Sequence, residues 1–454
     1  MKRLSTVLLI TLLLFLAACG GETEPPADDG ATVEAPEIPT QETETESEPP
    51  AEEPTLPPPV VEGEEPGSET PSGEESPAEG EQPGAEAPVA EAPASPVFPW
   101  PEDRFGYGIQ IHGNATVGDP VEIANTVSNQ LGMGWVKVQL KWPVVHPEPG
   151  TGQWFFYDGV IDEANNHGLN VMISVVGAPA WSRAAGGENG PPDDYNQYVE
   201  FLNETLDRYQ GEVHAVEVWN EQNLDREWTT PNGISPEDYV RFLQLAYDAI
   251  KAHDPNIIVI SGALSPTGDG DWVRWADDFA YLDRALAAGM LDYADCVGTH
   301  HNGINLPPDV PFDQTGSLEE ASTAEFRGPF DNPHHSWSFR TTLDTYAEKV
   351  QAIDPAMKLC VTEFGWASSE GYDTVPENFG FALDNTLQEQ ADYVVQAFQQ
   401  MHDSGNVWLA FLFNFDYGNK GSGPQDDTVP YSILDINGAP RPAFGAVAEM
   451  EKAP

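Results

Sequence analysis

Two glutamates, Glu221 and Glu363, each follow a short apolar run and lie about 140 residues apart in the chain. Two carboxyl groups can cleave a glycosidic bond if one protonates the leaving oxygen while the other attacks the anomeric carbon. At a separation of about 5–5.5 Å the attack forms a covalent glycosyl-enzyme, water releases the sugar, and the configuration is retained. The fold must therefore give the two carboxyl groups different surroundings, because the acid needs a raised pKa and the nucleophile must stay ionised.

Eight short apolar runs are the candidate strands that position these glutamates. They alternate with longer amphipathic segments, and eight strand–helix units is the number that closes a (β/α)8 barrel. An open doubly wound sheet is the alternative, but it needs a Gly-rich turn after the first strand, and Gly106-Tyr107-Gly108 lies inside that strand. The expected strands are Gly106–His112, Trp135–Leu140, Asn170–Val176, Ala215–Trp219, Ile257–Gly262, Cys296–His300, Lys358–Thr362 and Val407–Phe413.

The helical patterns between these runs complete the α/β fold class, a (β/α)8 TIM barrel over residues 97–454. Barrel enzymes carry their chemistry at the C-terminal ends of the strands, where Glu221 and Glu363 both fall. A long stretch after strand six, at about 303–337, is an insertion on that face, and we expect it to shape a substrate cleft. The expected helices are Val121–Leu131, Tyr157–His167, Asp193–Tyr209, Pro236–His253, Ala276–Ala288, Phe339–Ile353, Leu387–Ser404 and Arg441–Met450.

A resemblance to the retaining glycoside hydrolases of clan A, most to families 39 and 5, is carried by Val218–Asn223 and Val361–Trp366. Further similarity runs from Gly134 to Trp142 and from Gly168 to Trp181, so the likeness covers nearly the whole chain from about residue 100. The two-part motif is specific for the clan and says little about the substrate.

The resemblance implies a role for each residue of the motif. Glu221 is the expected acid/base, Glu363 the nucleophile, and Asn220 the residue that holds the sugar 2-hydroxyl. Lys137 stands on strand two, where the clan usually has an arginine that supports the nucleophile, and it offers a point charge without a bidentate fork. Glu217 either points into the barrel and pairs with Lys137 or faces a helix, and a structural role is expected for it.

The chain departs from the clan at two further places. After strand six it has His300-His301-Asn302, whereas the clan often has His-x-Tyr, so the tyrosine that orients the nucleophile is missing. The end of strand eight lacks the tryptophan that usually floors the sugar site, because Trp408 lies at the start of that strand. The missing tyrosine and the exchange of the usual arginine for Lys137 motivate a non-catalytic alternative.

Aromatic and histidine side chains at the strand ends are candidates for sugar binding. Trp142, Trp181 and Trp366 are expected to stack on sugar rings, since an aromatic face packs well against the C–H face of a pyranose. His300 and His112 are expected to line the same site.

Two histidine pairs, His300-His301 and His334-His335, raise the question of a metal site. Neither belongs to an i, i+4 pair or an HExxH motif, so we predict no metal and no cofactor.

The N-terminus has the pattern of an export signal. A basic start, an apolar run from Leu4 to Leu16 and then Ala17-Ala18-Cys19 are typical of a secretory signal, and the run is too short for a membrane span. The ending resembles a bacterial lipoprotein signal, in which lipidated Cys19 would anchor the protein to the membrane surface; an ordinary signal peptide with a chance cysteine is the alternative.

Residues 20–96 differ in composition from all that follows. They contain about 22 acidic residues, many prolines and no Lys or Arg, so we expect a disordered tether. The formal net charge of the chain is −56, which argues against nucleic acid as a partner.

Only two cysteines, Cys296 and Cys360, remain after Cys19. Both lie in apolar runs expected to form neighbouring strands. Buried, unreactive thiols are the first interpretation and a single disulfide is the alternative.

The sequence thus predicts a monomeric, extracellular, membrane-anchored retaining glycosidase that acts on an extracellular or cell-envelope polysaccharide. A carbohydrate-binding protein that has lost turnover and a transglycosylase that remodels wall polymers are the alternatives. The sugar, the linkage and internal versus terminal cleavage are left open.

Overall fold

The computed structural model describes residues 96–453. The predicted signal, Cys19 and the tether up to residue 95 lie outside the described residues. Within the described part, no helix combines the length and the apolarity needed to cross a membrane.

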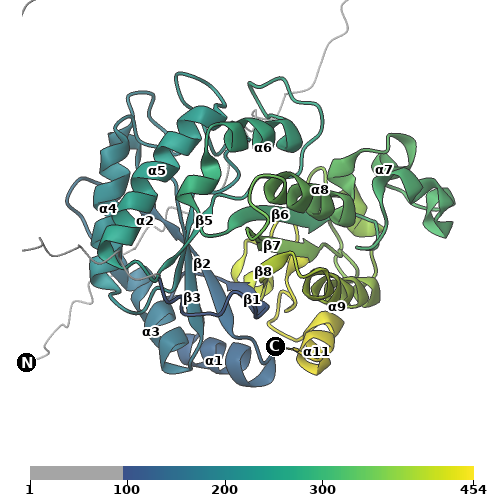
Figure 1. Cartoon of the computed structure of the whole chain (residues 1–454). Coiled ribbons are helices and arrows are strands. Elements are labelled where there is room, and N and C mark those ends of the chain that lie inside the picture. Colours follow the sequence, from purple (N-terminus) through teal and green to yellow (C-terminus); the bar gives the residue numbers. More distant parts are fainter. Residues whose placement is uncertain (1–95, 454) are drawn as a thin grey trace, which may run out of the picture. The chain divides into compact units, whose positions relative to one another are not determined.

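Eight parallel strands form the barrel, in the order β5-β4-β3-β2-β1-β8-β7-β6. Parallel bridges between Ile260 and Cys296 and between Leu264 and Thr299 join β5 to β6 and close it. The predicted (β/α)8 fold is confirmed (Figure 1). The strands are β1 Gly106–Ile111, β2 Trp135–Lys141, β3 Asn170–Val176, β4 Ala215–Val218, β5 Ile258–Ser261, β6 Val297–Gly303, β7 Leu359–Trp366 and β8 Val407–Leu412.

The inside of the barrel changes from apolar to charged along its axis. At the N-terminal end of the strands, large apolar side chains such as Trp135, Met172 and Phe411 form a separate core cluster, against which Phe98 and Trp100 pack. One inward position further along β2, the side chain is Lys137, which is fully buried. The charged layer is therefore supported from below by apolar packing.

Helices surround the strands, and side-chain caps fix several helix starts (Figure 1). Ser235 caps α5 by accepting the N–H of Asp238, and Thr386 forms a capping box with Glu389 at the start of α9. The predicted helix over Val121–Leu131 is in fact α1 followed by a π-helical turn over Thr126–Gln130. The helices are α1 Pro120–Asn125, α2 Trp142–Val145, α3 Asp158–Asn166, α4 Tyr195–Arg208, α5 Pro236–His253, α6 Asp278–Ala287, α7 Gly328–Asp331, α8 Phe339–Gln351, α9 Leu387–Ser404, α10 Tyr417–Lys420 and α11 Pro442–Glu449.

The insertion after β6 contains only short helical turns, α7 among them, before α8 begins.

Near the start of β6, Cys296 and Cys360 are joined by a disulfide with a Cα–Cα distance of 5.8 Å. Our first interpretation of these cysteines as free thiols was wrong, because Cys296, directly before β6, and Cys360, on the neighbouring strand β7, lie in the same buried cluster, where the two sulfur atoms meet. The alternative, a single disulfide, is confirmed.

Candidate active site

Glu221 and Glu363 lie at the C-terminal ends of β4 and β7, and each is less than a tenth exposed. After β4 the chain turns sharply: Trp219 and Glu221 have φ angles of 79° and 44°, a left-handed conformation that costs non-glycine residues energy. The N–H of Glu221 donates to the carbonyl of Ala263 at 2.8 Å, which holds this turn against the segment after β5.

Glu363 faces the barrel interior because of an irregularity in β7. The register between β6 and β7 pairs Thr299 with Val361 and His300 with Glu363, so Thr362 is an extra residue on β7. Side chains of a regular strand alternate between its two faces, but this bulge lets both Thr362 and Glu363 point inward.

Lys137 lies between two glutamates at the centre of the site. Its Nζ is 3.0 Å from Oε1 of Glu363 and 3.1 Å from Oε2 of Glu217, and no part of Lys137 is exposed. Burial alone would lower the pKa of Lys137, but the charges of Glu217 and Glu363 outweigh it and raise the pKa. The predicted pairing of Glu217 with Lys137 is confirmed, and the Oγ1 of Thr362 donates a further hydrogen bond to Glu217 at 2.6 Å.

His300 connects the other side of this cluster to Glu221. Its Nδ1 lies 3.2 Å from Oε1 of Glu221 and its Nε2 lies 3.7 Å from Oε1 of Glu217. Burial opposes a charge on His300, but Glu363, Glu221 and Glu217 outweigh it, and the pKa of the imidazole is raised. The prediction that His300 lines the site agrees with this position.

Arg226 is a partner of Glu221 that the sequence analysis missed. Its Nη2 lies 2.8 Å from Oε2 of Glu221, although the side chain of Arg226 is 65% exposed. Burial alone would raise the pKa of Glu221, but the hydrogen bond with His300 and the charge of Arg226 lower it to about 2. In the ligand-free site Glu221 is therefore ionised.

Several other polar groups surround the two carboxylates. The Nδ2 of Asn302 on β6 lies 3.5 Å from Oε2 of Glu363. Burial and the nearby charges of Asp427, Glu221 and Glu363 raise the pKa of Tyr431, so it stays a neutral phenol. Burial and the charge of Glu221 raise the pKa of the half-buried Glu227 to about 7. Sequence reasoning missed Tyr431 and Glu227, because their segments carry no motif, and it noted Asn302 only as the residue that stands where the clan often has tyrosine.

Two of the expected stacking tryptophans do not face the site. Trp142 is 1% exposed and stacks on Phe201 of α4 at 5.1 Å, and Trp366 is 1% exposed and packs against Phe339 of α8. Both predictions were wrong, because these rings point outward into the layer between strands and helices. Trp181 is 37% exposed and donates its Nε1–H to the carbonyl of His146 at 2.9 Å.

The remaining candidates lie near the barrel mouth. Asn220 is 6% exposed, and its buried Oδ1 has no hydrogen-bond partner among residues 96–453. His112 is half-buried with its ring against Tyr417 at 5.1 Å, and burial lowers its pKa. His301, by contrast, is buried against Phe339 outside the barrel, which lowers its pKa to about 4.

A cleft of about 840 Å³ opens from Glu221 and Asn302. Its walls include Trp275 from the segment after β5 and Trp337 from the insertion, so the insertion does help to shape it. Two arginines on its surface, Arg226 and Arg274, offset only part of the acidic charge.

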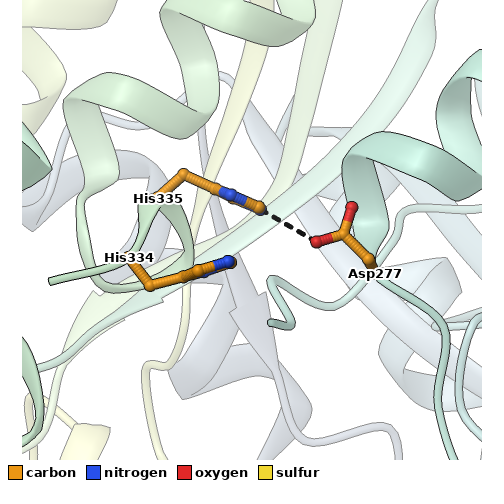
Figure 2. A group of neighbouring side chains, drawn as sticks. All are labelled: Asp277, His334 and His335. Carbon is orange, nitrogen blue, oxygen red and sulfur yellow. Dashed lines mark ion pairs between the residues drawn. The ribbon is translucent and has the colours of Figure 1, made fainter. Parts of the chain in front are cut away.

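Three side chains, of which His334 lines this cleft, could together hold a metal ion. Asp277, His334 and His335 each place one potential ligand atom within 4.8 Å of the others (Figure 2).

No protein-family model matches the sequence, and no curated protein matches it significantly. Among solved structures, a family 39 glycoside hydrolase from Bacteroides cellulosilyticus WH2 is similar with a TM-score of 0.53 at 20% identity, over 76% of this chain and 63% of that one. This chain thus spans less than two thirds of that protein.

Two other solved structures align over nearly their whole length. One is xylanase 10B from Thermotoga petrophila RKU-1 in complex with xylobiose, with a TM-score of 0.50 at 16% identity over 76% of this chain and 94% of that one. The other is beta-glycosidase BGL167, with a TM-score of 0.51 at 13% identity over 78% of this chain and 99% of that one. At such identities the likeness shows a common barrel fold.

Proposed function

We propose that this protein is a retaining glycoside hydrolase in which Glu363 is the nucleophile and Glu221 the acid/base. The observation that carries the proposal is the buried chain of charges that links the two carboxylates through Lys137, Glu217 and His300 at the mouth of the barrel. The similarity to solved glycosidases supports the same reaction class.

In the first step a carboxylate oxygen of Glu363 bonds to the anomeric carbon while the bond to the leaving oxygen breaks. Lys137 already donates to Oε1 of Glu363 and fixes that carboxylate in place. Asn302, at 3.5 Å from the other oxygen, holds it from a second side. Among the residues near Glu363, Asn302 is thus the one placed to take over the orienting role of the missing tyrosine.

The leaving oxygen must receive a proton in the same step, and Glu221 and His300 supply it as a pair. The low pKa of Glu221 and the raised pKa of His300 mean that one proton is shared across the 3.2 Å contact between them. When a sugar in the cleft replaces the exposed Arg226, Glu221 loses one of the two partners that keep it ionised. The proton then passes through Glu221 to the leaving oxygen.

In the second step water attacks the anomeric carbon, the bond to Glu363 breaks, and the water proton returns to Glu221. The buried carbonyl oxygen of Asn220 has no partner within the described part of the chain, which suits it to accept a hydrogen bond from the sugar 2-hydroxyl. The proton balance of the pair is then restored for the next turnover.

The cleft suggests the class of substrate, and the disulfide suggests the compartment in which the protein works. Trp275 and Trp337 are aromatic walls beside Glu221, which fits an oligosaccharide or polysaccharide chain. The Cys296–Cys360 disulfide fits an oxidising, extracellular compartment. We propose an extracellular polysaccharide as substrate and a lipid anchor at Cys19.

The roles are tested with a panel of activated aryl glycosides and 2-fluoro-sugar inactivators. We expect Glu363→Gln to abolish turnover, Glu221→Ala to be rescued by azide, and the inactivator to label Glu363, as read by mass spectrometry of peptides. Glu200→Gln, an exposed glutamate on α4, is the matched control and should behave as the wild type.

Normal turnover by Glu363→Gln would refute the assignment. Sugar binding without any product across the panel would instead favour the non-catalytic alternative. Product formed only when a sugar acceptor is added would favour the transglycosylase.

A further inference from the structure

We propose that Asp277, His334 and His335 bind a divalent transition-metal ion that fastens the insertion after β6 to the loop between β5 and α6. This proposal does not depend on the proposed function. It departs from the expectation drawn from the sequence, which looked for ligands spaced within one element. Here the ligands come from two segments that are more than 50 residues apart.

The positions of the donor atoms fit one ion. Nε2 of His335 and Oδ2 of Asp277 are 3.8 Å apart, and all three donors lie within 4.8 Å of one another. A zinc ion with bonds of about 2.0–2.2 Å holds its donors roughly 3–4 Å apart, so small side-chain movements complete the site. Figure 2 shows the two imidazole rings beside each other and Asp277 facing them.

Neighbouring side chains fix the position of His335. Oδ1 of the fully buried Asp278 lies 2.8 Å from Nε2 of His335, while Asp278 is itself held by the N–H of Thr267 and the hydroxyl of Tyr346. The ring of Phe279 stacks on His335 at 3.6 Å. Asp278 contacts the same nitrogen of His335 that faces Asp277, so its carboxylate adds negative charge where an ion would bind, while the stacked ring of Phe279 holds the imidazole in place.

His334 is oriented by its own neighbour. Its Nδ1 lies 3.0 Å from Oγ of Ser336 and 3.3 Å from the backbone nitrogen of Ser336. With the ring proton on Nδ1, donated to Oγ, Nε2 is the nitrogen that can bind an ion. The ring of His334 lines the 840 Å³ cleft, so an ion there also has a side open to water. Two histidines, one carboxylate and an open position are a donor set typical of zinc.

Local charge favours a cation at this point. The carboxylates of Asp277 and Asp278 both face Nε2 of His335, at 3.8 Å and 2.8 Å, and add negative charge at the cluster. An ion on Nε2 of His335 would take the place of the 2.8 Å contact between that nitrogen and Oδ1 of Asp278. Oδ1 of Asp277 is occupied as the N-cap of α6, and Oδ2 is left for the ion.

The consequence concerns the shape of the cleft. The loop before α6 carries Trp275 and the insertion carries Trp337, and both residues line the cleft. An ion bound by one ligand from the first segment and two from the second sets the distance between these two walls.

The test uses the tag-free full-length protein after removal of metals with a chelator. We expect titration with Co²⁺ to give visible d–d bands that saturate at one equivalent per chain, and Zn²⁺ to displace the Co²⁺. Asp277→Asn, which keeps the N-cap, and His334→Gln should each weaken binding at least about tenfold, the size of effect that loss of a supporting contact already has.

His402→Gln is the matched control, because His402 lies on α9 next to Asp403 and away from the cluster. It should bind the metal as the wild type does. Thermal unfolding gives a second measure: Zn²⁺ should raise the Tm of the wild type by a few degrees and leave that of His334→Gln unchanged. Absence of a saturable Co²⁺ signal would overturn the proposal. So would an affinity for Co²⁺ in Asp277→Asn and His334→Gln that equals that of the wild type.

Discussion

Replacing Lys137 by methionine is the sharpest test of how the barrel stabilises its charged interior. Lys137 is fully buried and lies 3.0 Å from Glu363 and 3.1 Å from Glu217. Methionine has a similar length but no charge, so the variant leaves two carboxylates facing each other without their common cation. Removal of one partner of a buried ion pair typically costs 3–5 kcal/mol, and we expect a loss of unfolding free energy of about that size.

A second substitution separates the loss of charge balance from the loss of packing. In Lys137→Met/Glu217→Gln the unpaired charge of Glu217 is gone, so at least half of the lost free energy should return. The matched control is Lys349→Met, which removes a lysine from the partly exposed pair with Asp283. Such a surface pair contributes only about 0–1 kcal/mol.

Urea unfolding at pH 7, followed by tryptophan fluorescence, gives the free energies by linear extrapolation. The slopes of the four proteins should agree, which shows that the unfolded states are comparable. Both Lys137 variants should lose hydrolytic activity, since Glu363 has lost its fixed partner. If Lys137→Met unfolds within about 1 kcal/mol of Lys349→Met, or if the double variant is no more stable than the single one, the account of the buried charges is wrong.

Two further predictions concern the contact between Glu221 and His300 and the disulfide of the barrel. The pKa of Glu221 is lowered from 4.5 to about 2, and that of His300 is raised from 6.5. The stability that this pair contributes is therefore complete between pH 4.5 and 6.5. It is lost as the pH falls toward 2 and as the pH rises through the raised pKa of His300. The difference in Tm between the wild type and His300→Gln should therefore be largest in that window and shrink above it, whereas a constant difference would contradict the assignment. The Cys296–Cys360 disulfide links residues 64 positions apart, and its removal in the double alanine variant should lower the free energy of unfolding by about 4 kcal/mol, as measured by urea unfolding. Detection of two titratable thiols in the denatured, unreduced wild-type domain would refute the pairing.

The strands were predictable because each is a short apolar run between polar helices, and the count of eight then determines the closure. The role of a single residue depends on whether its side chain lies on the inner or the outer face of the barrel. The sequence indicates this face for some strands and not for others. On β2 the polar residues Lys137 and Lys141 alternate with apolar ones, and this alternation already assigns Trp142 to the outer face. The error at Trp142 was thus avoidable.

The orientation of Glu363 was not predictable in the same way. Apart from Glu363 itself, the fully buried strand β7 has apolar or neutral residues on both faces, as parallel strands usually do, so no alternation marks its inner side. The bulge at Thr362, which turns Glu363 inward and leaves Trp366 outward, depends on the pairing with β6 and leaves no local mark. Arg226 was missed because its contact with Glu221 depends on the path of the loop after β4.

The arrangement of charges also explains how two similar carboxyl groups can perform different tasks. Glu217 holds two cations, and each of these contacts one of the two proposed catalytic residues. The cation beside Glu363 is Lys137, whose raised pKa makes its charge permanent, which suits a residue that must remain a carboxylate. The cation beside Glu221 is His300, which can give up its proton, which suits a residue that must deliver one and take it back. The two sides of the site thus differ in proton affinity because lysine and histidine differ, and the fully buried Glu217 holds both side chains in place.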